Sequence, residues 1–286
     1  MFMAVILGIL SALSFGIGDF LARFSSQEVG HRNSLFWMFV VGVSFYYTVF
    51  IFVGNGFHPN LIGISNSFLA GVLIMFGLLC LYRGLQMGPV SVVAPIVAIN
   101  PFFVFLIRYA LGSEPTLMQW IATLVIISGA ILISFSAESH QENLGLTKKQ
   151  IKESVVISFM SSVMLALGLI FAQEVSNTID PLEGVFYIRF FGLVSIAILI
   201  FFIRSKITLT KKAIPILFFQ GILESSGNFF IVYAYTFDKV SIAVVISSAF
   251  GLVTVVLAKF ILKELISKIQ GVGILLTFLG VVGLSI

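Results

Sequence analysis

Charged residues are scarce in this 286-residue sequence: they make up 10% of the chain, whereas hydrophobic residues make up 59%. A soluble domain normally has about a quarter of its residues charged, so this composition excludes an ordinary soluble fold. The single cysteine, Cys80, excludes an internal disulfide and a cysteine-based metal cluster. His31, His58 and His140 fall in or beside predicted loops, so we predict no metal site and no cofactor. The net charge of +4 does not indicate a nucleic-acid partner, because the basic residues lie in short loops.

Long, continuous apolar runs fill most of the chain. A helix needs roughly 20 apolar residues to cross a hydrocarbon core about 30 Å thick, and continuous rather than alternating runs favour helices over a barrel. We therefore predict an all-α membrane protein embedded in the lipid bilayer. Its ten transmembrane helices are expected at residues 3–22, 34–53, 67–86, 90–109, 116–136, 152–172, 182–203, 213–236, 240–262 and 267–286.

The sequence repeats itself at an offset of 150 residues, without gaps. Matched pairs include Ser11 with Ser161, Gly18 with Gly168, Gly71 with Gly221, Gly77 with Gly227, and Glu114 with Glu264. We predict a first five-helix repeat over residues 1–136, a polar linker over 137–150 and a second repeat over 151–286. Because five is an odd number of spans, the second repeat must enter the membrane inverted, and such repeats commonly enclose a central transport cavity.

Basic residues gather on the face opposite the two termini. Arg108 and Lys239 lie on the terminal face, and Arg189 falls inside a span. The opposite face holds Arg23, Arg32, Arg83, Lys148, Lys149, Lys152, Arg204, Lys206, Lys211, Lys212, Lys259, Lys263 and Lys268. Cytoplasmic loops collect Lys and Arg, so we expect both termini on the non-cytoplasmic side of a prokaryotic inner membrane.

The two repeats end in related patterns. The first reads Gly112-Ser113-Glu114-Pro115-Thr116-Leu117 and continues into a helix with Gly129. The second reads Lys263-Glu264-Leu265-Ile266-Ser267 and continues into a helix with Gly280. These patterns resemble the EamA family of the drug/metabolite transporter superfamily over nearly the whole chain. The resemblance implies a ten-helix transporter of amino acids, nucleotide precursors, sugars or other small metabolites, often directed outward.

A polar stripe on the predicted span 213–236 is the main candidate site. Gln220, Glu224 and Asn228 are four residues apart and share a helix face, and Tyr235 continues near it. A carboxylate near the middle of a span costs about 2.5–3.5 kcal/mol, so Glu224 should face a cavity or a partner, and it is our candidate for proton coupling. A structural network between helices is the alternative. Because the repeat partners of the stripe are Ala70, Ile74 and Leu78, the stripe was added to one half only.

Arg189 is the only base well inside a span and is predicted to lie at a depth similar to that of Glu224. Charges within membranes usually pair, so an Arg189–Glu224 ion pair is expected. Arg189 is either a clamp for an anionic group of the substrate or part of a structural salt bridge.

Pro95, Asn100 and Pro101 predict a break in the span 90–109, because each proline removes a backbone donor. Carbonyl groups freed beside Asn100 would line a substrate cavity, or the kink only shapes packing. The partners in the second half are Val245, Phe250 and Gly251, so an equivalent break is not expected there.

Two further pairs of charges have competing interpretations. Asp19 and Arg23 are four residues apart near one end of the first span and form either a surface pair or a gate. Glu114 and Glu264 begin helices, where a carboxylate suits the positive end of the helix dipole, so both are predicted to be structural.

Together these features predict a secondary active transporter, not an enzyme, that works by alternating access. The substrate is expected to be a small metabolite such as an amino acid or related zwitterion, exported and exchanged for protons. Residues 90–109 and 213–236 would line the cavity, with contributions from residues 3–22 and 182–203. The alternatives are a passive channel, a membrane enzyme acting on a lipid-like substrate and a scaffold. A monomer suffices for this architecture, and a homodimer is the alternative.

Overall fold

The structure is a computed structural model that describes residues 2–53, 57–58, 60–136, 146–234, 243, 246–247 and 249–284. All regular secondary structure in these ranges is helical. Eight of the described helical segments are long and apolar enough to cross a membrane, and two shorter apolar helices follow near the C-terminus. These findings confirm an all-α membrane protein.

The first half of the chain begins with two long helices, α1 (Phe2–Val29) and α2 (His31–Val53). They are joined by Gly30 alone, whose φ of 84° is a conformation that favours glycine. The half continues with α3 (Leu61–Met87), α4 (Val90–Val97), α5 (Asn100–Ala110) and α6 (Leu117–Ser136). α1 extends beyond the predicted span 3–22 because its polar C-terminal residues continue the helix, and α3 begins at Leu61, before the predicted span 67–86.

The second half contains α8 (Lys148–Ser176), α9 (Pro181–Phe202), α10 (Ala213–Ala234), α12 (Phe250–Ile261) and α13 (Lys268–Leu284). Thr147 and Gln150 form a capping box at the start of α8. Asp180 caps α9, and Pro181 occupies its first turn. Most of the predicted linker and much of the predicted span 240–262 lie outside the described residues.

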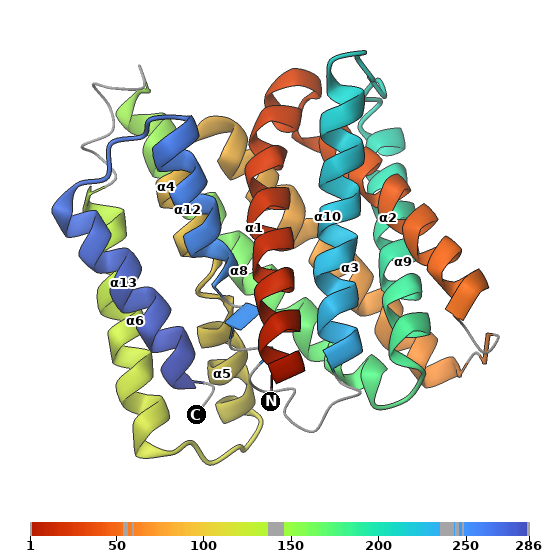
Figure 1. The fold of residues 1–286 in the computed structure, drawn as a ribbon, viewed down its shortest axis with the longest axis horizontal. Coiled ribbons are helices and arrows are strands. Elements are labelled where there is room, and N and C mark those ends of the chain that lie inside the picture. Colours follow the sequence, from red (N-terminus) through yellow and green to blue (C-terminus); the bar gives the residue numbers. More distant parts are fainter. Residues whose placement is uncertain are drawn as a thin grey trace.

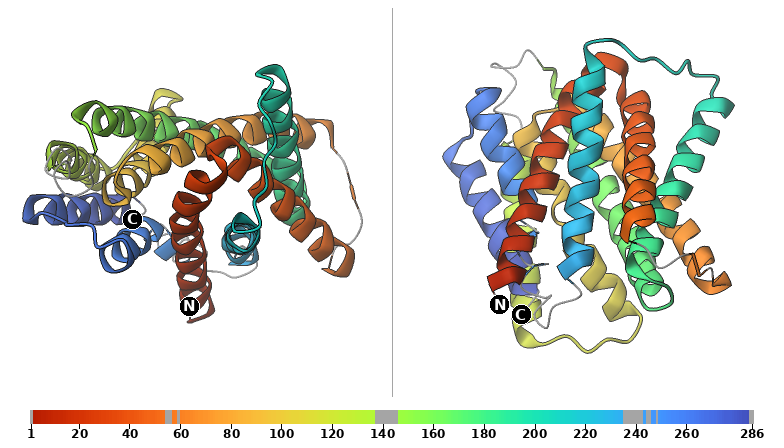
Figure 2. Two further views of the ribbon diagram at one scale, coloured as in Figure 1. Left: turned by 90° about the horizontal axis from the view of Figure 1, so that it is seen from above. Right: turned by 45° about the vertical axis from the view of Figure 1, so that its right-hand side comes forward.

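Each half contributes its first helix to the other half. α1 packs along α10, and α8 packs along α3. These two pairs and the α6–α13 pair are the three most extensive contacts between helices. The α1–α10 and α3–α8 pairs, which we call the first and second seams, lie on opposite sides of the bundle (Figure 2). α1 and α8 run in opposite directions, and α1 begins at the same end of the bundle at which α13 ends (Figure 1).

The two seams share atomic contacts at the 150-residue offset. Ser11 Oγ donates to the Gly227 carbonyl at 2.9 Å in the first seam, and Ser161 Oγ donates to the Gly77 carbonyl at 2.7 Å in the second. All four residues belong to matched pairs of the repeat. The sequence repeat is therefore also a repeat of packing.

The predicted break in span 90–109 is confirmed, since α4 ends at Val97 and α5 starts at Asn100. Pro101 lies in the first turn of α5, where a missing N–H costs nothing, and Pro95 lies inside α4.

The expectation that the second half is not equivalently broken is wrong. α12 begins after Ala249, the repeat partner of Ile99, and the two residues have nearly the same φ and ψ: −80° and 4° at Ile99, −72° and 0° at Ala249. The backbone N–H of each donates to the carbonyl three residues earlier, to Ile96 and Ile246 respectively. The break is thus built into the backbone of the repeat, and the prolines reinforce it in one half only.

Candidate functional site

The first seam buries a carboxyl group against a helix backbone. Glu224 of α10 is 4% exposed, and a Cβ atom placed on Gly18 of α1 would lie 2.8 Å from its Oε1 atom. The glycine thus lets the carboxyl group reach the α1 backbone. In the second seam, Gly168 faces Ile74, the repeat partner of Glu224. The same close approach therefore accommodates an acid in one seam and an aliphatic side chain in the other.

Asp19 is the partner of Glu224. It is 5% exposed, and its carboxyl group lies within hydrogen-bonding reach of the Glu224 carboxyl group. Glu224 Oε1 receives no hydrogen bond from a nitrogen or hydroxyl donor among the described residues. Carboxylates only accept hydrogen bonds, so two of them can bond to each other only when one carries a proton. The geometry therefore suits a carboxyl pair that holds a single proton.

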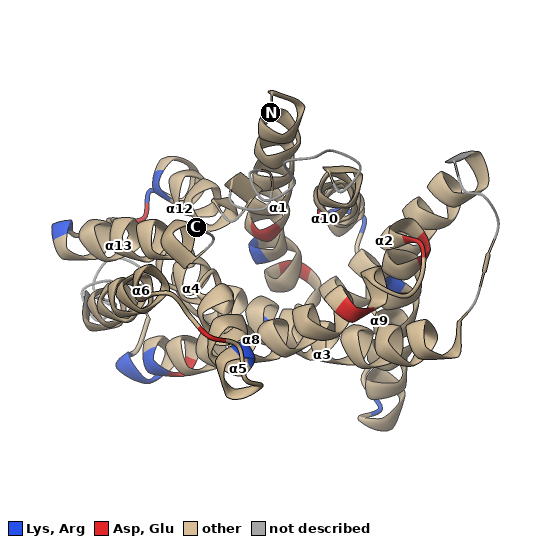
Figure 3. Ribbon diagram, turned by 90° about the horizontal axis from the view of Figure 1, so that it is seen from below, with Lys and Arg blue, Asp and Glu red and all other residues tan. Residues whose placement is uncertain are grey.

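The expected pairing of Asp19 with Arg23 is wrong. Arg23 reaches away from Asp19 and donates to the backbone carbonyls of Leu85 and Gly88 at the end of α3. Those carbonyls are left without intrahelical partners by the end of the helix, so a guanidinium group is a suitable cap. Asp19 is free to face α10 because it lies well inside α1, rather than at the membrane surface. Figure 3 shows how few charged residues the helices carry in total.

The expected Arg189–Glu224 ion pair is also wrong, although the two residues meet. Among the described residues, Arg189 Nη2 donates to the backbone carbonyl of Glu224 at 3.2 Å and forms no ion pair with its carboxylate. Nη1 contacts Met38 Sδ at 3.4 Å, and the guanidinium lies 5.8 Å from the Phe39 ring centroid. Arg189 is thus held by α2 and α10 beside the carboxyl pair, where its positive charge acts on Glu224 without a direct ion pair.

The three polar residues of the stripe on α10 lie in different environments. Gln220 is fully buried and satisfied: its Oε1 accepts from Ser25 Oγ at 2.6 Å, and its Nε2 donates to Tyr82 Oη at 2.7 Å. Asn228 is half-buried and donates to the Glu224 carbonyl of its own helix at 3.0 Å. Gln220 therefore fits the structural-network alternative, whereas Glu224 has the unmet hydrogen-bonding capacity that a binding site requires. Tyr235 lies outside the described residues.

Asn100 lies at the helix break, and the structure does not bring it into contact with the carboxyl pair. It is buried, and its Nδ2 donates to the Val97 carbonyl at 3.2 Å. This bond satisfies one of the carbonyl groups that the break exposes. Asn100 thus stabilises the broken backbone between α4 and α5.

Glu264 has a role that the sequence did not predict. Its carboxylate accepts from the backbone N–H groups of Val90 at 2.9 Å and Ser91 at 2.8 Å, so it caps α4 of the other half instead of its own helix. Its repeat partner Glu114 is exposed, and residues 240 and 241, the partners of Val90 and Ser91, lie outside the described residues. This clamp joins the two halves at one end of the bundle.

Asp19 and Tyr82 were missed as neighbours of Glu224, although the repeat contained a signal for Asp19. The repeat partners of Asp19 and Glu224 are Leu169 and Ile74, so both positions lose their charge at the same offset. An acid replaced by an aliphatic residue at both positions, next to the matched glycines Gly18 and Gly168, would have indicated that Asp19 and Glu224 contact each other. No sequence signal marks Tyr82, which approaches from α3 through the tertiary fold.

Comparisons with known proteins agree with this architecture. The model of the EamA-like transporter family matches residues 2–135 and 153–286, one match for each half of the chain. An uncharacterized protein of Methanocaldococcus jannaschii is 32% identical over 137 residues, which cover 46% of this chain and 97% of that protein. That relative is therefore about as long as one repeat. A protein of known crystal structure superposes with a TM-score of 0.67 at 12% identity, and the match covers 98% of this chain and 95% of the other. This likeness supports the fold alone.

Proposed function

The chain belongs to the EamA-like transporter family, and from this premise we propose that it is a secondary active transporter coupled to protons through Glu224. At the coarser level it is a membrane transporter of the drug/metabolite transporter type, an integral membrane protein with a small-molecule substrate. The proposal adds the mechanism, the coupling ion and the class of substrate.

The contact between Asp19 and Glu224 carries the proposal. Two buried carboxyl groups in contact favour one shared proton, because like charges at this distance repel each other. The unmet Oε1 atom of Glu224 gives a cationic group of a substrate a place to bind once that proton has left. The proton and the substrate would then compete for one site, which is the simplest basis for exchange.

The substrate is proposed to be an amino acid or a related zwitterion, moved outward. An amine would replace the proton on the carboxyl pair, and the adjacent Arg189 offers a positive charge to a carboxylate. Asn228 stays in the proposed site because it is fixed beside the Glu224 carbonyl, and Tyr235 stays in it on the sequence pattern alone.

Alternating access is proposed to come from two inverted repeats of five spans each, around a central cavity. The opposite directions of α1 and α8 and the matched contacts of the two seams support this arrangement (Figure 1). Opening the end that the Glu264 clamp closes requires the carboxylate to release Val90 and Ser91. The distribution of basic residues supports placing both termini outside the inner membrane, and a cytoplasm-only reporter active at Ile286 would contradict that orientation.

The test begins with a metabolite panel, in which binding is detected as thermal stabilisation of the purified protein. A substrate found in this way is then followed in proteoliposomes, with and without a proton gradient. Glu224→Gln should abolish gradient-driven accumulation and leave downhill exchange intact, because Asp19 still offers a carboxylate to the amine whereas the amide at position 224 cannot take up or release a proton. Glu174→Gln, which changes an exposed acid on α8, is the matched control.

Retained gradient-driven accumulation in Glu224→Gln would overturn the coupling proposal. Continuous current through the reconstituted protein, without saturation or counterflow, would favour a channel instead. A turnover product of a lipid-like substrate would favour a membrane enzyme.

A further inference from the structure

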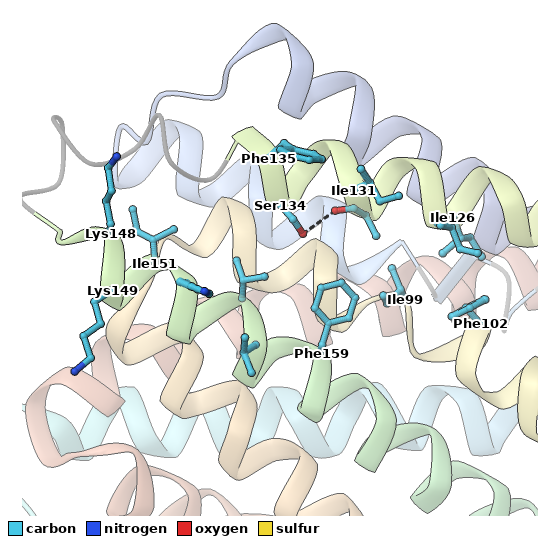
Figure 4. A pocket seen from close by; sticks show the side chains of 15 residues that line it. Ile99, Phe102, Ile126, Ile131, Ser134, Phe135, Lys148, Lys149, Ile151 and Phe159 are labelled. Atoms are coloured by element: carbon cyan, nitrogen blue, oxygen red, sulfur yellow. Dashed lines mark hydrogen bonds between the residues drawn. The ribbon is translucent and has the colours of Figure 1, made fainter.

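A groove on the side of the bundle has the shape of a binding site for a lipid chain. It lies between α5, α6 and α8, and its volume is about 1030 Å³. α6 packs along α13 and α8 packs along α3, so the facing sides of α6 and α8 leave this space between them. Figure 4 shows Phe135, Ile131 and Phe159 along its walls, with Lys148 and Lys149 at one end.

The groove is the length of one leaflet. Along α6 its lining runs from Ile126, near the middle of the helix, to Phe135 at the end. At 1.5 Å per residue this span is about 14 Å, close to half of a hydrocarbon core about 30 Å thick. A lipid with its headgroup at the lysine end would therefore place its acyl chain against these walls, with the chain end near Ile99 at the helix break.

The walls offer almost nothing to a polar ligand. The lining above the lysines is aliphatic and aromatic, and its one hydroxyl group, on Ser134, donates to the Ala130 carbonyl of its own helix at 2.8 Å. Ile131 and Phe135 are 48% and 79% exposed, so this surface faces the bilayer. A hydrocarbon chain is the ligand that such walls favour.

The polar end of the groove is positively charged. Lys148, Lys149 and Lys152 line it, and Glu153 pairs with Lys149 at 3.9 Å. Within the described part of the chain, Lys148 and Lys152 have no acidic partner within 4 Å. Lys148 and Lys149 also occupy the first turn of α8, where they add to the positive end of the helix dipole instead of offsetting it. An anionic headgroup would offset the repulsion among the lysines and the repulsion between Lys148, Lys149 and the positive end of the α8 dipole.

We propose that this groove binds an anionic phospholipid of the leaflet that faces the lysines, with its phosphate at Lys148 and Lys152 and one acyl chain against α6 and α8. Basic pockets between membrane helices bind such headgroups. The repeat supports a dedicated site, because the partner of Lys152 in the first half is Phe2 and the base is therefore not part of the repeated pattern. The proposal requires only that the chain spans a membrane and is independent of the transport mechanism.

The test measures lipid preference of the full-length protein by native mass spectrometry, with added phosphatidylglycerol or phosphatidylcholine. The wild type should prefer phosphatidylglycerol, and the double variant Lys148→Gln/Lys152→Gln should bind it about 30-fold more weakly, since each lysine near an anionic surface contributes roughly five-fold. The double variant Lys211→Gln/Lys212→Gln is the matched control, because it removes two exposed lysines that do not line the groove. A second variant, Ile131→Trp, keeps the lysines and fills the groove, and it should also weaken binding.

Equal binding of the two lipids by the wild type would overturn the proposal, as would an unchanged preference in Lys148→Gln/Lys152→Gln. Inorganic phosphate that displaces phosphatidylglycerol stoichiometrically, together with unchanged binding by Ile131→Trp, would also overturn it, since the site would then recognise an anion without its chain.

Discussion

The first and second seams share their helix-packing contacts but differ in the side chains that they bury. Both bring a glycine of one helix against the other helix, and both contain a serine hydroxyl bonded to a glycine carbonyl. Only the first seam, between α1 and α10, buries acids: Asp19 and Glu224 stand where the second seam has Leu169 and Ile74. Because the second seam packs with Leu169 and Ile74 at the matched positions, the fold does not require the carboxyl pair. Its presence therefore calls for a function other than packing.

The largest effect is expected when an acid is placed in the second seam. Ile74→Glu puts a carboxylate beside Gly168 without a partner like Asp19, and a charge near the middle of a span costs about 2.5–3.5 kcal/mol. We expect a marked loss of folded protein, measured by thermal unfolding in detergent. Ile74→Leu should behave like the wild type. An Ile74→Glu protein as stable as the wild type would show that either seam accommodates an acid. The acids of the first seam would then no longer indicate a function other than packing.

Substituting alanine for the matched glycines Gly168 and Gly18 should lower the stability of the protein by different amounts. A Cβ atom at Gly168 would lie 2.6 Å from Ile74 Cγ1 and 3.1 Å from the Ile74 backbone nitrogen, so Gly168→Ala should cost about 1–3 kcal/mol through overpacking. At Gly18 the nearest atom is the flexible end of Glu224, so Gly18→Ala should cost less stability and instead displace the carboxyl group. Unfolding midpoints and transport rates of the two variants separate these effects. The same stability loss in both would mean that the carboxyl group is as tightly packed as Ile74.

Gln220 should matter for stability and not for coupling. Gln220→Leu removes the partner of buried Tyr82 and one partner of Ser25, and an unsatisfied buried group costs about 1–3 kcal/mol. Its counterpart Ala70 needs no such partner. The unfolding midpoint should fall while the proton dependence of transport is unchanged. Loss of proton dependence in a folded Gln220→Leu protein would move Gln220 into the coupling site.

The smallest effects test the packing that the seams share. Ser11→Ala and Ser161→Ala each remove a hydroxyl-to-carbonyl bond, and such bonds between membrane helices contribute about 0.6 kcal/mol on average. Ser11 also bonds to Ser247 at 2.7 Å, so its loss should be slightly larger. Chemical unfolding of the two variants should give nearly equal shifts. A much larger cost for Ser161→Ala would show that the seams are not equivalent as scaffolds.

The sequence predicted the fold well because the apolar runs and the repeat both report on the backbone. Helix positions, the break at Pro95 and Pro101, and the membrane class all follow from local composition. The site was harder to predict, because side-chain partners depend on how helices rotate and cross. Arg189, Arg23 and Glu264 were each assigned the wrong partner: the first two bind backbone carbonyls, and Glu264 binds the amide groups of a distant helix. Arg23 and Glu264 bind backbone groups that helix ends leave unpaired, whereas Arg189 binds a carbonyl in the middle of α10. Periodicity does not reveal either kind of backbone partner.

The central claim is that Asp19 and Glu224 share a proton, and infrared difference spectroscopy of the reconstituted protein tests it without a known substrate. A protonated carboxyl group has a carbonyl stretch that a carboxylate lacks, and a pH titration follows its loss. We predict one such band in the wild type, absent in Glu224→Gln and altered in Asp19→Asn, because each variant removes one member of the pair. Spectra in which neither substitution changes the band would contradict the shared proton and, with it, the proposed coupling.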